Sequence, residues 1–167
     1  MKNIVNCNFL NHFMNKFTPR NINIFLMFKL PSAYFCGIRV SAISEQQAIA
    51  RVKHKWINQN PFKSLYWAVQ GMASELVTGI LLMKKIEESG KKISMLVTNQ
   101  HGTFTKKATG RINFICKDGD KIKQAIDETI STGEGQNLIM IAEGFDQENE
   151  SVSKFEYEWS IKVKSPQ

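Results

Sequence analysis

The chain has 167 residues, a formal net charge of +7, 43% hydrophobic residues and 22% charged residues. This length fits one domain with a buried core, and the composition excludes an intrinsically disordered chain and a bundle of membrane-spanning helices. The positive charge is concentrated at the amino-terminal end, where five basic residues and no acidic residue precede Glu45. No arginine-rich run or aromatic RNA-binding motif accompanies this basic arm, so the sequence does not indicate a nucleic-acid-binding protein.

The amino-terminal end combines a loose extension with an apolar segment. Residues 1–13 are rich in Asn and Phe and precede Met14, which is a second candidate start, so we expect an extension at 1–13 and a single domain over 14–167. The apolar residues 22–28 mimic a signal peptide, but Lys29 interrupts them, no small-residue cleavage site follows, and they are shorter than the roughly 18 residues of a membrane span. We interpret residues 16–30 as an amphipathic helix that Pro31 ends, with secretion as the alternative.

The next segments predict a hairpin and then the longest helix of the chain. Residues 36–43 and 48–56 alternate in polarity around a turn near Ser44, as strands do. Residues 64–88 carry apolar residues at spacings of three and four, with Ser64 or Lys63 near the start of the helix and Gly90 after its end. Its other positions are mostly small, so we expect this helix to be enclosed by the rest of the domain.

The remaining elements can enclose this helix. We predict strands at 93–104 and 107–116, an amphipathic helix at 118–132, and strands at 136–145 and 154–164. The last strand alternates most clearly, with Phe155, Tyr157 and Trp159 on its apolar side. The order favours an α+β fold in which one curved, mainly antiparallel sheet surrounds the long helix.

The cysteines and histidines show none of the spacings that bind metals or form redox pairs. The three cysteines are far apart, and the three histidines form no HExxH or paired-ligand pattern. Each histidine is expected to be partly exposed or locally hydrogen-bonded. We therefore expect a protein of the reducing cytoplasm with no bound metal.

The element order and two short segments resemble the hotdog fold. The segments are LPSAYFCG at residues 30–37 and WINQNPF at residues 56–62, and the resemblance extends over nearly the whole chain from Met14. More specifically, the chain resembles an uncharacterised thioesterase-like hotdog family. That family is related to acyl-CoA thioesterases that act on phenylacetyl-CoA and hydroxybenzoyl-CoA. The resemblance implies a homodimer or homotetramer, a site between two subunits, and coenzyme A only as part of the substrate.

Those thioesterases share a motif at the start of the central helix. An Asn lies six residues before a His-Gly-Gly, and an Asp or Glu lies nine residues after that His. Asn60 and Glu75 stand at the Asn and acid positions here, whereas Tyr66, Trp67 and Ala68 replace His-Gly-Gly. Two functional positions therefore match and the third departs from the pattern.

The resemblance implies a separate catalytic role for each of these residues. Backbone amides near Trp67 and Ala68 would stabilise an oxyanion, Glu75 would act as nucleophile or general base, and Asn60 would position water or the acid. Burial would raise the pKa of Glu75, which suits a base. Tyr66 could donate a hydrogen bond in place of the histidine, although both aromatic rings could also fill the channel of a pantetheine arm.

Two alternatives and one further site remain open at this point. Glu75 could be a structural residue, hydrogen-bonded to Gln70, Ser74 or a partner subunit. The protein could also bind an acyl chain or lipid without catalysis, in a pocket lined by Tyr66, Trp67 and Met72. Basic residues near the turn between the third and fourth strands could contact the phosphates of coenzyme A, or could be solvated: Lys106, Lys107 and Arg111.

Overall fold

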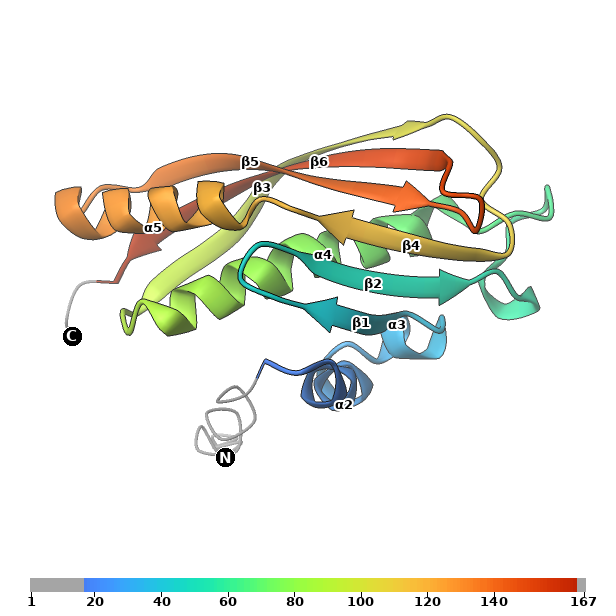
Figure 1. The fold of residues 1–167 in the computed structure, drawn as a ribbon, viewed down its shortest axis with the longest axis horizontal. Coiled ribbons are helices and arrows are strands. Elements are labelled where there is room, and N and C mark those ends of the chain that lie inside the picture. Colours follow the sequence, from blue (N-terminus) through green and yellow to red (C-terminus); the bar gives the residue numbers. More distant parts are fainter. Residues whose placement is uncertain (1–16, 165–167) are drawn as a thin grey trace, which may run out of the picture.

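The computed structural model describes residues 17–164 and places six strands in one sheet. The strand order is β1-β2-β4-β5-β6-β3, and every neighbouring pair is antiparallel (Figure 1). The elements are α2 (Pro19–Lys29), α3 (Pro31–Phe35), β1 (Arg39–Ile43), β2 (Ala48–Lys53), the short 3₁₀ helix η1 (Trp56–Asn58), α4 (Trp67–Glu88), β3 (Ile93–Phe104), β4 (Arg111–Cys116), α5 (Gly119–Thr132), β5 (Gln136–Phe145) and β6 (Ser151–Val163).

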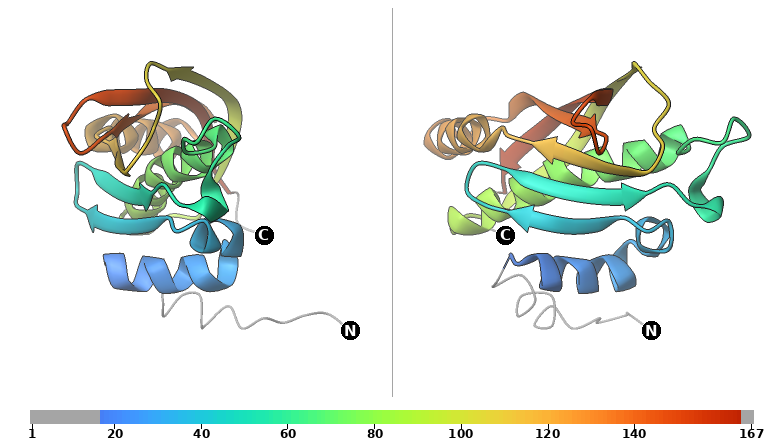
Figure 2. Two further views of the ribbon diagram at one scale, coloured as in Figure 1. Left: turned by 90° about the vertical axis from the view of Figure 1, so that its right-hand side faces the viewer. Right: turned by 45° about the vertical axis from the view of Figure 1, so that its right-hand side comes forward.

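The long helix α4 lies on the inner face of the curved sheet, as the views in Figure 2 show. Residues 76–82 are all buried, so the helix has no solvent-facing side over about two turns. Its small and apolar residues pack against the inner side chains of β6, which include Phe155, Tyr157 and Trp159. The α+β hotdog architecture expected from the sequence is therefore confirmed, including the alternation of the last strand.

Several predicted boundaries differ from those in the structure. The long helix begins at Trp67 and not at Ser64, because Ser64 belongs to a turn closed by Asn60. The strand predicted from residue 107 begins at Arg111, since Gly110 before it has a φ of +70° that extended pairing does not allow. The last strand is longer than predicted and begins at residue 151.

The hairpin strand predicted at 48–56 ends at Lys53. The side chain of Asn58 accepts a hydrogen bond from the N–H of Lys55 at 2.7 Å and donates to the carbonyl of Lys53 at 3.0 Å. These bonds turn the chain into η1, and Trp56 is consequently 84% exposed instead of continuing the apolar side of the strand.

The two edges of the sheet differ. Asn23 on α2 donates to the carbonyl of Val40 at 2.9 Å and accepts from its N–H at 2.8 Å, so the helix covers the edge of β1. The amphipathic helix predicted here is confirmed, with Ile22 and Leu26 buried. Strand β3 forms the other edge, and within residues 17–164 it pairs only with β6. A long open edge usually requires protection.

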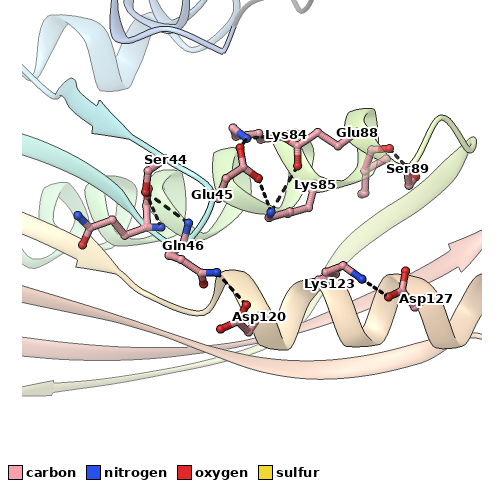
Figure 3. Close-up of polar contacts among 12 residues, drawn as sticks. Ser44, Glu45, Gln46, Lys84, Lys85, Glu88, Ser89, Asp120, Lys123 and Asp127 are labelled. Atoms are coloured by element: carbon pink, nitrogen blue, oxygen red, sulfur yellow. Dashed lines mark hydrogen bonds and ion pairs between the residues drawn. The ribbon is translucent and has the colours of Figure 1, made fainter.

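The turn between β1 and β2 contacts both α4 and α5. Glu45 forms ion pairs with Lys84 and Lys85 near the end of α4 (Figure 3). The backbone N–H of Gly119 donates to the carbonyl of Gln46 at 3.2 Å. A Cβ at residue 119 would overlap the carbonyl oxygen of Glu45, so this contact requires glycine.

No helix in the described part of the chain is long and apolar enough to cross a membrane.

Candidate functional site

The start of α4 presents two free backbone N–H groups. The carbonyl of Tyr66, the residue before the helix, accepts from the N–H groups of Val69 at 3.0 Å and Gln70 at 3.2 Å. No side chain caps the helix, and the N–H groups of Trp67 and Ala68 donate to no acceptor among residues 17–164. The positive end of the helix dipole lies at the same place, so this end can stabilise a negative oxygen.

A hollow of about 370 Å³ lies beside the start of α4. It is bounded by the turn before the helix and by the connection between β3 and β4, and its walls bring together four of the candidate residues: Asn60, Trp67, Lys106 and Lys107. Gln70 and Phe104 also line it. The other five candidates, which are Tyr66, Ala68, Met72, Glu75 and Arg111, do not border this hollow.

Glu75 lies further along α4, on a partly open strip in the first half of the helix. Gly71, Met72 and Glu75 are partly exposed, and the residues around them on the helix are buried. Burial raises the pKa of the Glu75 carboxyl above its ordinary value. Within residues 17–164 this carboxylate has no hydrogen bond or ion pair. An unpaired acid of raised pKa has the properties of a general base.

The local residues expected to satisfy Glu75 are engaged elsewhere. Gln70 accepts a hydrogen bond from Ser153 at 2.9 Å and donates to the carbonyl of Leu65 at 3.2 Å. The Ser74 hydroxyl donates to the hydroxyl of Tyr157 at 2.8 Å and lies 3.0 Å from the carbonyl of Gly71. The structural alternative in which Gln70 or Ser74 partners Glu75 is therefore wrong for this chain.

A polar network holds α4 against β6 next to Glu75. The Tyr157 hydroxyl donates to the carbonyl of Gly71 at 3.0 Å, and the indole N–H of Trp159 donates to Thr78 at 3.1 Å. Burial raises the pKa of Tyr157 to about 12, so its hydroxyl stays neutral. Sequence reasoning placed Tyr157 and Trp159 on the buried face but missed this network; the signal was that buried Tyr and Trp need polar partners.

Asn60 shapes the turn that precedes α4. Its side-chain oxygen accepts from the N–H groups of Phe62 at 3.0 Å and Ser64 at 3.2 Å, and its amide donates to the Ser64 hydroxyl at 3.0 Å. These bonds set the position of the helix start and occupy the Asn60 side chain within the turn. Its action on water or on the acid stays a prediction.

The aromatic pair at the helix start lies on the surface. Tyr66 is 43% exposed and Trp67 is 56% exposed, and their ring centroids are 5.8 Å apart in an edge contact. They do not fill the interior of this chain. Trp56, Ile57 and Phe62 in the preceding segment are exposed as well. The end of the domain that holds the helix start is therefore apolar on its surface.

The three basic residues suggested for coenzyme A do not form one site. Lys106 is paired with Asp146 at 2.8 Å and with Glu150, and these hydrogen bonds hold its pKa above the ordinary range. Lys107 is exposed at the rim of the hollow. Arg111 belongs to a separate hollow on the outer face of the sheet.

Two further groups were not singled out from the sequence. Asp146, Glu148 and Glu150 in the turn between β5 and β6 bring carboxylate oxygens within 4.8 Å of one another, an arrangement that can hold a metal ion. Two of these acids already pair with Lys106. His54 is partly exposed, as expected, but its ring nitrogen Nε2 is buried without a partner among the described residues.

Comparison with known proteins places the chain in a family. The model of the family described as Domain of unknown function (DUF4442) matches residues 19–161. The chain belongs to the DUF4442 family. The matched range includes α4 with its free amides and Glu75, as well as the edge strand β3. No match was found among curated proteins.

Solved structures share the fold of this DUF4442 chain. A Pseudomonas aeruginosa protein of unknown function, called a "Probable Thioesterase", has a TM-score of 0.75 at 17% identity, with 88% of this chain and 97% of that chain covered. A Chlorobaculum tepidum protein of unknown function has a TM-score of 0.73 at 17% identity, with 88% and 98% covered. A thioesterase from Haemophilus influenzae has a TM-score of 0.66 at 16% identity, with 90% and 94% covered. At these identities the likeness shows the hotdog fold.

Proposed function

We propose that this DUF4442 protein hydrolyses an acyl thioester, with acyl-CoA as the substrate class. The observation that carries the proposal is the pairing of two unused catalytic elements on one helix. The N–H groups of Trp67 and Ala68 are free to bind an oxyanion, and the carboxylate of Glu75 is partly buried, unpaired and raised in pKa. The thioesterase names of two structural neighbours support the same chemistry.

The spacing along α4 indicates that the reacting groups come from two copies of the chain. Glu75 lies eight residues after Trp67, which at 1.5 Å per residue is about 12 Å along the helix axis. A nucleophile or base must lie about 3 Å from the atom on which it acts. The amides of one copy and Glu75 of a second copy therefore form each site, in agreement with the two-subunit site that the family resemblance implies.

The open edge of β3 supplies a surface for this second copy. It is 12 residues long and carries Leu96 at 65% exposure, whereas α2 covers the opposite edge of the sheet. We expect a homodimer in which two β3 edges pair. Sedimentation should show Leu96→Lys dissociating this dimer, while Ile139→Lys, a control on a central strand at 55% exposure, leaves it intact. Dissociation by the control alone would contradict pairing through β3.

Hydrolysis is tested with a panel of acyl-CoA substrates that differ in chain length and head group. The wild type should release free CoA from at least one of them. Glu75→Gln should bind the same substrate with similar affinity and release CoA at least about 100-fold more slowly, because the amide keeps the shape but cannot act as base or nucleophile. Full activity in Glu75→Gln would exclude this residue as the catalytic acid.

A non-catalytic acyl-binding protein is the second candidate. The observation that favours it is the replacement of His-Gly-Gly by Tyr66, Trp67 and Ala68, which puts two exposed rings at the helix start. Isothermal titration with acyl-CoA and free fatty acids separates the candidates. Tight binding of an acyl chain without CoA release from any substrate in the panel would favour binding over catalysis.

A further inference from the structure

A group of basic side chains lines a second hollow, of about 240 Å³, on the outer face of the sheet. We call these residues the basic hollow: Arg39 on β1, Arg51 and Lys53 on β2, Lys55 after β2, and Arg111 on β4. The strands involved are neighbours in the sheet (Figure 1). Residues that alternate with them, such as Val52 and Ile112, are buried, so the basic hollow faces away from α4.

Strand pairing sets these like charges directly opposite one another. Arg39 is the cross-strand partner of Arg51, and Lys53 is the partner of Arg111. Opposed like charges destabilise a sheet. No ion pair within residues 17–164 involves a residue of the basic hollow, although many other lysines of the protein are paired with acids. Among residues 17–164, no acidic side chain within ion-pair distance offsets this repulsion, so a bound anion would relieve it.

Arg39 is held in a fixed orientation at one wall. Its Nη1 donates to the carbonyls of Tyr34 and Ile38, both at 2.7 Å, and its guanidinium lies 3.6 Å from the centre of the Tyr34 ring. The other N–H groups of the guanidinium form no hydrogen bond with a described residue. A planar, fixed guanidinium with free N–H groups is suited to phosphate oxygens.

The basic hollow is compact and does not continue along the sheet. Arg51 to Lys55 spans about 13 Å at 3.3 Å per residue. Beyond it, the next side chains on the same face are neutral, namely Ile49, Asn113 and Ile115. A nucleic acid would need a longer basic track. We propose that the basic hollow binds a small anion that carries two or more phosphate groups.

Two classes of ligand carry such phosphate groups. One is a free nucleotide or polyphosphate, and the other is the nucleotide end of coenzyme A. Titration calorimetry at low salt with inorganic tripolyphosphate, ADP and CoA distinguishes them. Tripolyphosphate should bind more tightly than monophosphate, and its affinity should fall as salt rises. Because the nucleotide end of CoA is ADP with an added 3′-phosphate, CoA binding at least about tenfold tighter than ADP assigns the hollow to CoA, and ADP binding as tight as CoA or tighter assigns it to free nucleotides; the proposal holds in both cases and does not depend on thioester hydrolysis.

A charge-matched pair of variants makes the test specific. Lys53→Gln/Arg111→Gln removes two charges from the basic hollow, and Lys91→Gln/Lys92→Gln removes two exposed charges from the connection between α4 and β3. The first variant should weaken tripolyphosphate binding at least about tenfold, because charge-assisted contacts are lost. The control should bind like the wild type.

The stability of the first variant separates lost binding from misfolding. Its melting temperature without ligand should equal or exceed that of the wild type, because an opposed pair of like charges has been removed. Three results would overturn the proposal: no phosphate binding by the wild type, equal weakening in both variants, or tighter binding of a single-stranded oligonucleotide or of anionic lipid vesicles than of tripolyphosphate.

Discussion

Trp67→Pro removes a single proposed oxyanion donor and should leave the fold intact. Trp67 is the first residue of α4, where proline is favoured, and its N–H has no acceptor among the described residues. Tyr66 before it has a φ of −61° and a ψ of 137°, the extended conformation that a following proline requires. We therefore expect the free energy of unfolding to change by less than about 1 kcal/mol relative to Trp67→Ala.

The effect on catalysis should be much larger. Loss of one oxyanion donor lowers kcat by about 100- to 1,000-fold, or roughly 3 kcal/mol. Trp67→Ala is the matched control, because it removes the same exposed ring and keeps the N–H. Acyl-CoA hydrolysis followed by thiol release should show kcat falling by this factor from the Ala variant to the Pro variant. Equal kcat values in two folded variants would refute the role of this amide.

Three further predictions concern the groups around α4. Burial raises the pKa of Glu75 in the folded protein above 4.5, so ionisation of this carboxyl opposes folding. In urea unfolding, Glu75→Gln and the wild type should be equally stable below pH 4.5. As pH rises from 4.5 to the raised pKa, the variant should become the more stable of the two, by about 1.4 kcal/mol for each pH unit. Lower stability of the variant at pH 8 would mean that the carboxylate has a partner. Tyr157→Phe and Ser74→Ala should each cost about 1 to 2 kcal/mol, and a double-mutant cycle should give a coupling of at least about 0.5 kcal/mol, whereas additive losses would contradict their bond. Hydrogen bonds from Lys84 and Lys85 lower the pKa of Glu45 from 4.5 to about 2. The Glu45 carboxylate should therefore stabilise the fold above pH 4.5, and this stabilisation should be lost as pH falls through about 2. A wild type that stays more stable than Glu45→Gln below pH 2 would contradict this.

The fold could be predicted from the sequence because its main signals are local. The spacing of apolar residues defines α4, and strict alternation defines β6. The exact start of α4 could not be predicted, since the turn before it depends on the carbonyl of Ala108, which accepts from the N–H of Leu65. The displacement of the helix start from the predicted Ser64 to Trp67 also decides which backbone N–H groups are free.

The state of the candidate site residues depended on contacts between distant parts of the chain. Gln70 and Ser74 are near Glu75 in sequence, yet both take partners on β6 that are 83 residues away. Lys106 is paired with Asp146, 40 residues away. The basic hollow likewise requires the strand register that brings Arg111 opposite Lys53. Residue types and spacing locate candidates, but only these pairings show which of them are free to act.

Subunit mixing tests the proposed two-copy site most directly. Trp67→Pro lacks one oxyanion amide and Glu75→Gln lacks the acid, so each homodimer should be nearly inactive. If every site combines the amides of one copy with Glu75 of the other, a mixed dimer holds one complete site. An equal mixture that is unfolded and refolded together forms mixed dimers in half of all cases, so about one quarter of wild-type activity should return. Activity that stays at the mean of the two separate variants, with mixed dimers confirmed by mass spectrometry, would contradict a site shared between two copies.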